Sequence, residues 1–232
     1  MQNTLALFQD RKDEINLYFD MMNSLSINTQ LAHSINTKLF KIMKSNLLLM
    51  LYNLVEACIR SGFDEIYESV NNENLDYDSL ISELQHFWLT NKIQNIYSSR
   101  TASKKKYIET AQKIIEESRL GKSIRFPDGK ELHKLLNFEG NLGSELISKI
   151  CDRHGIRYTI QNRDSTDNVT KVKNERNRLA HGDISFADCA RDLTLSDIKD
   201  IKDGTFQFIE DILNGMEDYC INKSYKAVKN SS

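Results

Sequence analysis

The residues best suited to chemistry in this chain lie within one short stretch, Lys171–Gly182. This stretch contains an arginine, an amide and a histidine close together, namely Arg176, Asn177 and His181. Histidine transfers protons near neutral pH, and the planar, permanently charged guanidinium of arginine binds two phosphate oxygens at once. These side-chain types predict phosphoryl-transfer chemistry.

Cleavage of RNA without a metal ion requires three tasks at one phosphate. A base removes the proton of the 2′-hydroxyl, a cation stabilises the charge that builds up on the phosphate, and an acid protonates the leaving oxygen. His181 suits the proton transfers, Arg176 suits the phosphate, and Asn177 can orient either group by hydrogen bonds. Three further cations of the stretch are candidates for binding neighbouring phosphates: Lys171, Lys173 and Arg178.

A structural interpretation of the same residues stays open. Cations near the end of a helix interact favourably with its negative dipole end, and glycine commonly terminates helices. Arg178, His181 and Gly182 fit this pattern without any catalytic role. The sequence alone leaves both interpretations standing.

The helix that carries these residues limits the geometry of the site. Asn177 and His181 are four residues apart and share a face, whereas Arg176 and His181 lie roughly 140° apart around an ideal helix. Arg176 and His181 therefore meet at one phosphate only if the helix end unwinds or a second copy of the chain contributes. A symmetric homodimer with facing helix ends would bring both groups together.

Two polar residues, Asn53 and Glu56, interrupt the most apolar segment of the chain. We expect them to be buried, and a buried amide and carboxylate usually satisfy backbone groups or an arginine. The alternative is that Glu56 pairs with Arg176 or Arg178 and supports the candidate site.

The composition favours a helical protein and excludes several kinds of site. Among 232 residues there are only one proline and nine glycines, which favours long helices over a fold with many turns. The net charge of −2 is not that of a protein with a strongly basic surface, so any RNA contact must come from local clusters. The four cysteines form no CxxC pair, which argues against zinc and against a redox dithiol. We expect no metal and no cofactor.

The sequence also indicates a cytoplasmic protein that does not cross a membrane. The scattered cysteines are typical of reduced, mostly buried thiols, and the first residues lack an apolar signal core. The most apolar run, Leu47–Leu51, is too short to span a bilayer and is better explained as part of a buried helix.

Hydrophobic periodicity predicts the helices that must position the candidate site. An amphipathic helix is expected over about 5–25, and a central helix from Thr37 to about Ser61, with Gly62 as its stop. Four other helices are expected over about 64–71, 79–96, 107–120 and 144–154. A further helix begins somewhere around 164–169 and ends at His181, and the last runs from about Thr194 or Ser196 to about Ile221. Residues 98–106 read as a polar, exposed segment, and residues 157–160 are the best candidate for a short strand.

These elements predict a single all-α domain over residues 1–232. The region at about 98–140 is expected to be a variable, irregular insertion, and the tail at about 223–232 is expected to be frayed. No internal repeat or linker divides the chain.

The stretch from Arg176 to Gly182 (Arg-Asn-Arg-Leu-Ala-His-Gly) resembles the signature of HEPN-domain proteins: an arginine, a polar residue, a short spacer and a histidine. Three further segments resemble one prokaryotic group of stand-alone HEPN-like nucleases in that superfamily, namely Phe8–Phe19, Leu51–Ala57 and Leu179–Phe186. The resemblance covers most of the chain, although the region at about 98–140 contributes little.

The resemblance implies an antiparallel helical bundle that forms homodimers and a metal-independent endoribonuclease site composed across the dimer. At matching positions, Arg176 would bind the phosphate, His181 would be the acid or base, and Asn177 their polar partner. Such enzymes often serve as toxins in toxin–antitoxin or phage-defence systems, so the expected partners are RNA, a second copy and an antitoxin or defence protein. The superfamily also contains members without catalysis, and the alternative is a nucleotide- or protein-binding module of this kind.

Overall fold

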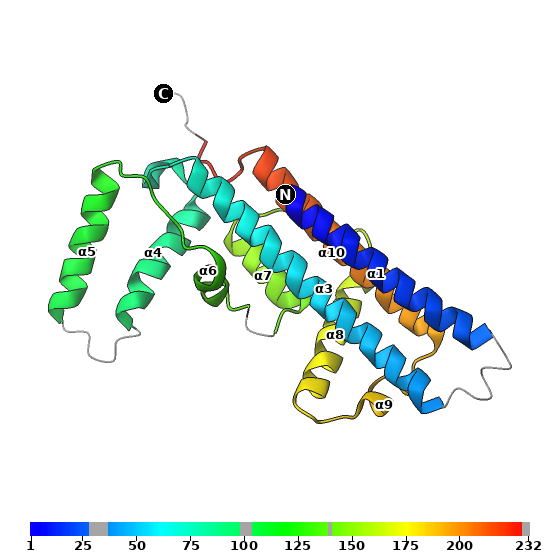
Figure 1. The fold of residues 1–232 in the computed structure, drawn as a ribbon. Coiled ribbons are helices and arrows are strands. Elements are labelled where there is room, and N and C mark those ends of the chain that lie inside the picture. The colour runs from blue at the N-terminus through cyan, green and yellow to red at the C-terminus, as the bar shows by residue number, and fades with distance from the viewer. Residues whose placement is uncertain (28–36, 98–103, 139–140, 229–232) are drawn as a thin grey trace.

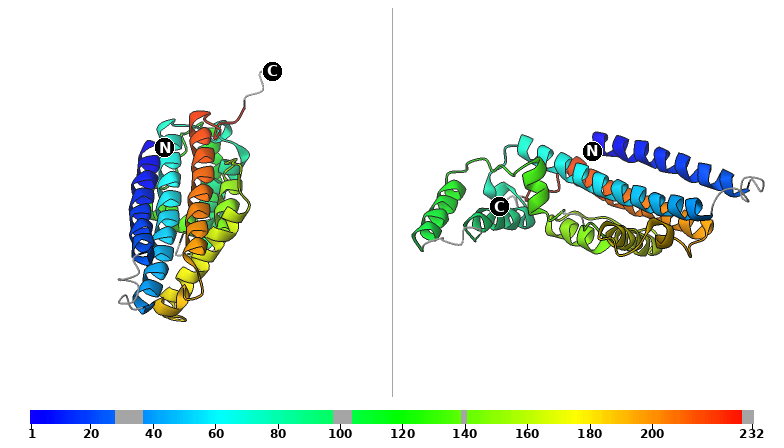
Figure 2. Two further views of the ribbon diagram at one scale, coloured as in Figure 1. Left: turned by 90° about the vertical axis from the view of Figure 1, so that its right-hand side faces the viewer. Right: turned by 60° about the horizontal axis from the view of Figure 1, so that its bottom comes forward.

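The computed structural model describes residues 1–27, 37–97, 104–138 and 141–228, and the regular structure of these residues is helical apart from one isolated β-bridge. Three long helices lie side by side: α1 (Gln2–Ile27), α3 (Thr37–Asn72) and α10 (Leu195–Ile221). Helix α1 runs opposite to α3 and α10, as Figures 1 and 2 show. The prediction of an all-α antiparallel bundle is confirmed.

Helix α3 is the central helix of the bundle. It packs against α1, α10 and α8 (Asp164–Ala180), and its apolar residues Leu47, Leu48, Leu51 and Leu54 are fully buried. The helix has the length and composition of a membrane span over Lys38–Asn72, but 61% of its most apolar window is buried inside the protein. Such burial is typical of the core helix of a soluble domain.

Helix α3 continues through Gly62 instead of ending there. A Cβ atom at Gly62 would lie 2.6 Å from Sδ of Met216 in α10, so glycine permits the two helices to approach closely. The predicted stop at Gly62 is wrong because a tertiary contact, and not a chain turn, favours the glycine. The separate helix expected over 64–71 is the last part of α3.

Helix α10, which corresponds to the last helix expected from the sequence, buries a regular apolar stripe. Its start is fixed by a capping box, in which the hydroxyl of Thr194 accepts from the backbone of Asp197 and the Asp197 carboxylate accepts from that of Thr194. Its stripe of buried apolar residues includes Ile198, Ile201, Phe208, Ile209, Ile212 and Leu213.

The middle of the chain contains more helix than the sequence predicts. Helices α4 (Ser82–Tyr97) and α5 (Lys104–Arg119) form a pair at one end of the molecule, and the short α6 (Gly129–Leu135) follows (Figure 1). The three lysines expected in a polar loop, Lys104–Lys106, form the first turn of α5 instead. The remainder of that predicted loop, 98–103, lies outside the described residues.

The predicted strand over residues 157–160 is extended but has no partner strand in the described part of the chain. Helix α7 (Ser144–Arg153) is followed by Gly155, whose φ of +67° turns the chain, and residues 156–160 then run across α10. A Cβ atom at Gly215 would lie 2.6 Å from the backbone oxygen of Arg157. The alternation of exposed and partly buried side chains in this segment therefore reflects packing against a helix.

The beginning of the tail is ordered, so the prediction of fraying from residue 223 is wrong for residues 223–227. Tyr225 is buried, Lys223 and Lys226 pair with Glu73, and Lys226 forms an antiparallel bridge with Leu80. The aromatic ring anchors this segment, and residues 229–232 lie outside the described chain.

Candidate functional site

The C-terminal end of α8 is a rigid platform for the candidate residues. His181 is the C-cap, and its N–H donates to the Asn177 carbonyl at 2.9 Å. Gly182 has a φ of +75°, and the N–H of Asp183 donates to the Arg178 carbonyl at 2.9 Å. This is a Schellman motif, which requires a residue that tolerates the left-handed region. Gly182 therefore terminates the helix, and no unwinding precedes His181.

His181 is exposed at this helix end. Its imidazole makes no hydrogen bond with any residue that the structure describes, so both ring nitrogens are open to solvent. An imidazole in this position is accessible to a substrate, and its attachment to a capped helix end limits its movement.

Arg176 is half-buried and faces α3. Its guanidinium carbon lies 4.5 Å from the centre of the Tyr52 ring, within the range of a cation–π interaction. The Tyr52 hydroxyl accepts the Leu142 N–H at 3.3 Å. Burial raises the pKa of the Tyr52 phenol, and the nearby Glu56 carboxylate raises it further. Tyr52 therefore stays protonated and holds the guanidinium against the bundle.

Asn177 joins the candidate arginine to the chain before α7. Its Oδ1 accepts from Nη1 of Arg176 at 3.1 Å, and its Nδ2 donates to Oδ1 of Asn141 at 3.4 Å. The Ser144 and Thr170 hydroxyls lie 2.8 Å apart and reinforce the same contact between α7 and α8. The amide of Asn177 thus orients the Arg176 guanidinium within one chain.

One copy of the chain does not bring Arg176 and His181 to the same face. Because α8 stays helical up to His181, the separation of roughly 140° around the helix axis is retained. Asn177 and His181 share the outer face, while Arg176 lies on the side of the buried Val172. Of the two ways in which the groups could meet, unwinding of the helix end is not observed.

Two of the three predicted phosphate-binding cations, Lys171 and Arg178, are seven residues apart and share a side of α8, whereas Lys173 lies on another side. Lys171 is exposed. Hydrogen bonds from Thr194 lower the pKa of Asp197, and the positive charge of Lys171 lowers it further. Lys173 packs its side chain over Gly143, where a Cβ atom would lie 3.0 Å from Cδ of the lysine. They do not form one continuous basic patch.

Arg178, the third of these cations, is bound by an acidic residue that the sequence analysis missed. Its Nη1 lies 2.9 Å from Oε2 and 3.0 Å from Oε1 of Glu175. Glu175 Oε2 also accepts from the Cys189 thiol at 3.3 Å, which attaches the short α9 (Phe186–Cys189) to α8. Burial, with help from Glu175, raises the pKa of Cys189 to about 11, so this thiol stays protonated. The spacing of three between Glu175 and Arg178 is the signal that could have predicted the pair.

The two supporting residues differ in their environment. Asn53 is exposed, so the prediction that it is buried is wrong: no described element covers this position of α3. Glu56 is partly buried and forms an ion pair with Arg60, with 2.6 Å between Oε1 and Nη2. Arg60 also donates to the Phe138 carbonyl at 2.8 Å. Glu56 thus satisfies an arginine, as expected, but that arginine belongs to its own helix.

Among the described residues, no three His, Cys, Asp or Glu side chains lie close enough together to hold a metal ion.

Comparison with protein-family models matches residues 2–225 to the family described as HEPN_MAE_28990-like HEPN. No curated protein and no solved structure gives a significant match. The matched range includes every described helix from α1 to α10, so it covers the bundle and the candidate site together.

Proposed function

The chain belongs to the HEPN_MAE_28990-like HEPN family, and from this membership and the geometry of α8 we propose that it is a metal-independent endoribonuclease. Arg176 and His181 are its reactive groups, and its active site is composed across a homodimer. The observation that carries the proposal is the exposed imidazole of His181 on a capped helix end, one turn from the amide that holds Arg176. Its biological role is that of a toxin or effector in a toxin–antitoxin or phage-defence system.

The proposed reaction uses the 2′-hydroxyl of the RNA as nucleophile. One His181 imidazole removes its proton, the 2′-oxygen bonds to the adjacent phosphorus, and the bond from phosphorus to the 5′-oxygen breaks. An imidazolium then protonates the leaving 5′-oxygen, while Arg176 stabilises the additional charge on the phosphate oxygens. The products are a 2′,3′-cyclic phosphate and a 5′-hydroxyl. The imidazole that accepts the first proton supplies it to the leaving oxygen, so each phosphate needs one His181 and one Arg176, and these come from different copies of the chain.

The need for a second copy follows from the helix geometry. Arg176 and His181 of one chain point away from each other around α8, so a phosphate bound by one Arg176 is better reached by the His181 of a partner. A face of α3 next to the site supports such a pairing. It contains half-buried Leu49 and Met50 and exposed Asn53, which described residues of the same chain cover only partly.

A second candidate function is a non-catalytic module that binds a nucleotide or a protein partner. The observation in its favour is the distribution of charge: the net charge is −2, Arg178 is paired with Glu175, and Lys173 packs over Gly143. This alternative predicts binding without turnover of RNA and tolerance of substitution at His181.

The test compares RNA cleavage by the wild type, Arg176→Ala and His181→Ala in the presence of a chelator. We expect each substitution to lower the rate by about a hundredfold or more, since both proton transfer and charge stabilisation contribute at that level. His86→Ala and Arg125→Ala are matched controls, because both residues are exposed and lie outside the site. Full activity of folded His181→Ala, or loss of activity on chelation alone, would refute the proposed mechanism.

A further inference from the structure

The extended segment 156–160 has open backbone groups along a groove of the protein surface. Its alternate side chains, Ile156, Tyr158 and Ile160, are buried or half-buried, while Arg157 and Thr159 are exposed. The Arg157 carbonyl lies against Gly215 of α10, whereas the N–H and C=O groups of residues 158–160 make no hydrogen bond with any residue that the structure describes. A polypeptide in this conformation is an unpaired strand edge, to which another strand can add.

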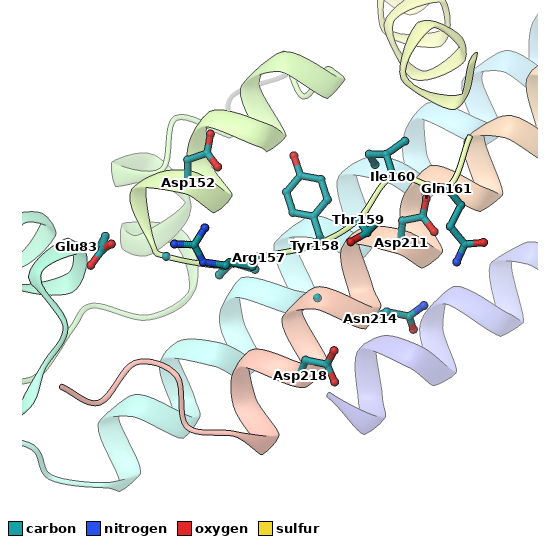
Figure 3. Close-up of a pocket in the computed structure, with 13 residues that line it drawn as sticks. Glu83, Asp152, Arg157, Tyr158, Thr159, Ile160, Gln161, Asp211, Asn214 and Asp218 are labelled. Carbon is teal, nitrogen blue, oxygen red and sulfur yellow. Dashed lines mark hydrogen bonds between the residues drawn. The ribbon is translucent and has the colours of Figure 1, made fainter. Parts of the chain in front are cut away.

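A hollow of about 710 Å³ follows this segment on the surface of α10 (Figure 3). It continues at one end into a hollow of about 410 Å³ that shares Arg157 and Asp218, and at the other into one of about 730 Å³ that shares Gln161. We call the three together the α10 groove. It follows α10 from Asp200 to Asp218, roughly 27 Å, which is the length of about eight extended residues.

The charges of the α10 groove favour a cationic occupant. Glu83, Asp152 and Asp218 line the central hollow and form no ion pair with any cation in the described ranges. Figure 3 shows them around the segment, with Arg157 as the cation beside them. The acids repel a polyanion such as RNA, so the groove suits a basic polypeptide.

The segment is fixed firmly enough to act as a template. The N–H of Gln161 donates to the buried carboxylate of Asp211 at 2.9 Å, and Gln207 donates to the other oxygen of the same carboxylate at 2.9 Å. At its other end the backbone of Arg157 packs directly on Gly215. An edge that is held in place loses little conformational entropy when a strand binds.

The same region already shows how an extended segment pairs. The N–H of Ile81 donates to the Tyr225 carbonyl at 3.1 Å, and the N–H of Ala227 donates to the Ser79 carbonyl at 2.9 Å. The start of the tail thus forms an antiparallel bridge with the residues just before α4. Backbone pairing of an added segment is therefore compatible with this end of the molecule.

We propose that the α10 groove binds an extended, lysine- or arginine-rich segment of a partner protein, which pairs with residues 157–160 as an added β-strand. The backbone hydrogen bonds provide the pairing, and Glu83, Asp152 and Asp218 select basic side chains. The groove lies at the start of α8, roughly 25 Å along that helix from His181. Binding there leaves the nuclease site open, and the inference does not depend on the proposed nuclease activity.

The probe is a fluorescent octapeptide of alternating lysine and valine, and the measurement is fluorescence anisotropy with the full chain at low ionic strength. We expect saturable binding that weakens as salt is added, and at least about tenfold weaker binding of the matching glutamate–valine peptide. Asp152→Asn together with Asp218→Asn should weaken binding of the basic peptide by about tenfold, because both carboxylates are exposed and unpaired. The control is Asp10→Asn with Glu14→Gln on α1, which makes the same change in charge at exposed positions away from the groove.

The backbone pairing is tested with two N-methylated versions of the basic peptide, methylated at odd or at even positions. One of the two should lose binding by at least about tenfold, because one edge of the added strand faces the segment. Amide hydrogen exchange of residues 157–160 should slow when the unmodified peptide binds. Equal binding of both methylated peptides, equal binding to the groove variant and its control, or no saturable binding would overturn the proposal.

Discussion

Arg176 and His181 have different environments on one helix, and the difference matches their proposed tasks. The guanidinium is packed against Tyr52 and bound by Asn177, whereas the imidazole is exposed. The sequence could predict both residues because their types and spacing are local. It could not predict Tyr52 or Asn141, since these reach α8 from other elements and only the packed bundle brings them close.

Tyr52 is a positioning residue for Arg176, so removing its ring should reduce turnover more than substrate binding. We expect Tyr52→Leu to lower kcat by about tenfold, with a smaller change in KM, because a cation–π contact of about 1–2 kcal/mol is lost. Tyr52→Phe retains the ring and should retain most of kcat. Single-turnover kinetics on RNA measure the effect. Equal losses in the two variants would show that the hydroxyl, and not the ring, supports the site.

His154 makes the stability of the fold depend on pH. It is buried, Nδ1 lies 2.6 Å from the Ile150 carbonyl and therefore carries the proton, and Nε2 has no described partner. Burial lowers the pKa of His154 to about 4. Between about pH 6.5 and pH 4 the unfolded chain binds a proton that the folded chain does not bind, so stability falls as the pH falls through this window.

The expected loss between pH 6.5 and pH 4 is about 3 kcal/mol of unfolding free energy. Urea denaturation at several pH values measures it. His154→Phe fits the surrounding rings of Phe63, Tyr67 and Phe87 and should remove this part of the pH dependence. If the wild type and the variant lose stability equally in this window, His154 is not the group responsible.

At the scale of the elements, periodicity predicts the long helices well and fails where glycines mediate contacts between helices. Helices α1, α3 and α10 bury regular apolar stripes, which the sequence reveals directly. Gly62 resembles a helix stop but lies inside α3 against Met216. Residues 157–160 resemble a strand because they alternate, although the layer beneath them is a helix. A single sequence does not specify which element a glycine or an alternating segment meets.

Two glycines of α10 should respond in opposite ways to alanine, although both lie in the same helix. A Cβ atom at Gly215 would lie 2.6 Å from the backbone oxygen of Arg157, and backbone cannot move aside cheaply. At Gly204 the obstacle is the end of the Asn168 side chain, which can rotate. We expect Gly215→Ala to destabilise the protein by about 1–3 kcal/mol. Gly204→Ala should be neutral or stabilising by up to about 1 kcal/mol, owing to helix propensity.

Thermal unfolding followed by circular dichroism distinguishes the two variants. A drop in Tm for Gly204→Ala as large as that for Gly215→Ala would contradict this prediction. It would mean that Asn168 of α8 cannot move aside, and that α8 packs on α10 as tightly as residues 157–160 do.

At the scale of the whole molecule, the proposed nuclease site and the α10 groove lie at opposite ends of α8. The first offers an exposed imidazole and nearby cations, and the second offers unpaired acids. Because the two surfaces are separate, a basic segment bound in the α10 groove would leave the proposed nuclease site uncovered.

If the chain is a toxin, its expression should stop growth through RNA cleavage. We expect growth arrest of the expressing cells by the wild type and normal growth with His181→Ala at equal protein level, since the exposed imidazole is needed for turnover but not for folding. His86→Ala should arrest growth like the wild type. Arrest by both histidine variants would separate toxicity from the proposed chemistry.

A site composed across a dimer makes a prediction that a site within one chain does not. A heterodimer of the Arg176→Ala and His181→Ala variants contains one site with both residues intact and one site with both replaced, if each site takes its arginine and its histidine from different copies. Mixing two inactive variants, with partial unfolding and refolding to exchange subunits, should therefore restore activity. Random exchange makes half of the dimers mixed, each with one of two sites intact, so the expected recovery is about a quarter of the wild-type rate.

The control is the double variant Arg176→Ala, His181→Ala mixed with each single variant, which leaves no intact composite site. If Arg176 and His181 act within one chain, no mixture of the two single variants recovers activity. The geometry of α8 argues against that outcome: the helix stays regular to its cap, the two side chains remain on different faces, and only a second helix end can bring the missing group to the phosphate.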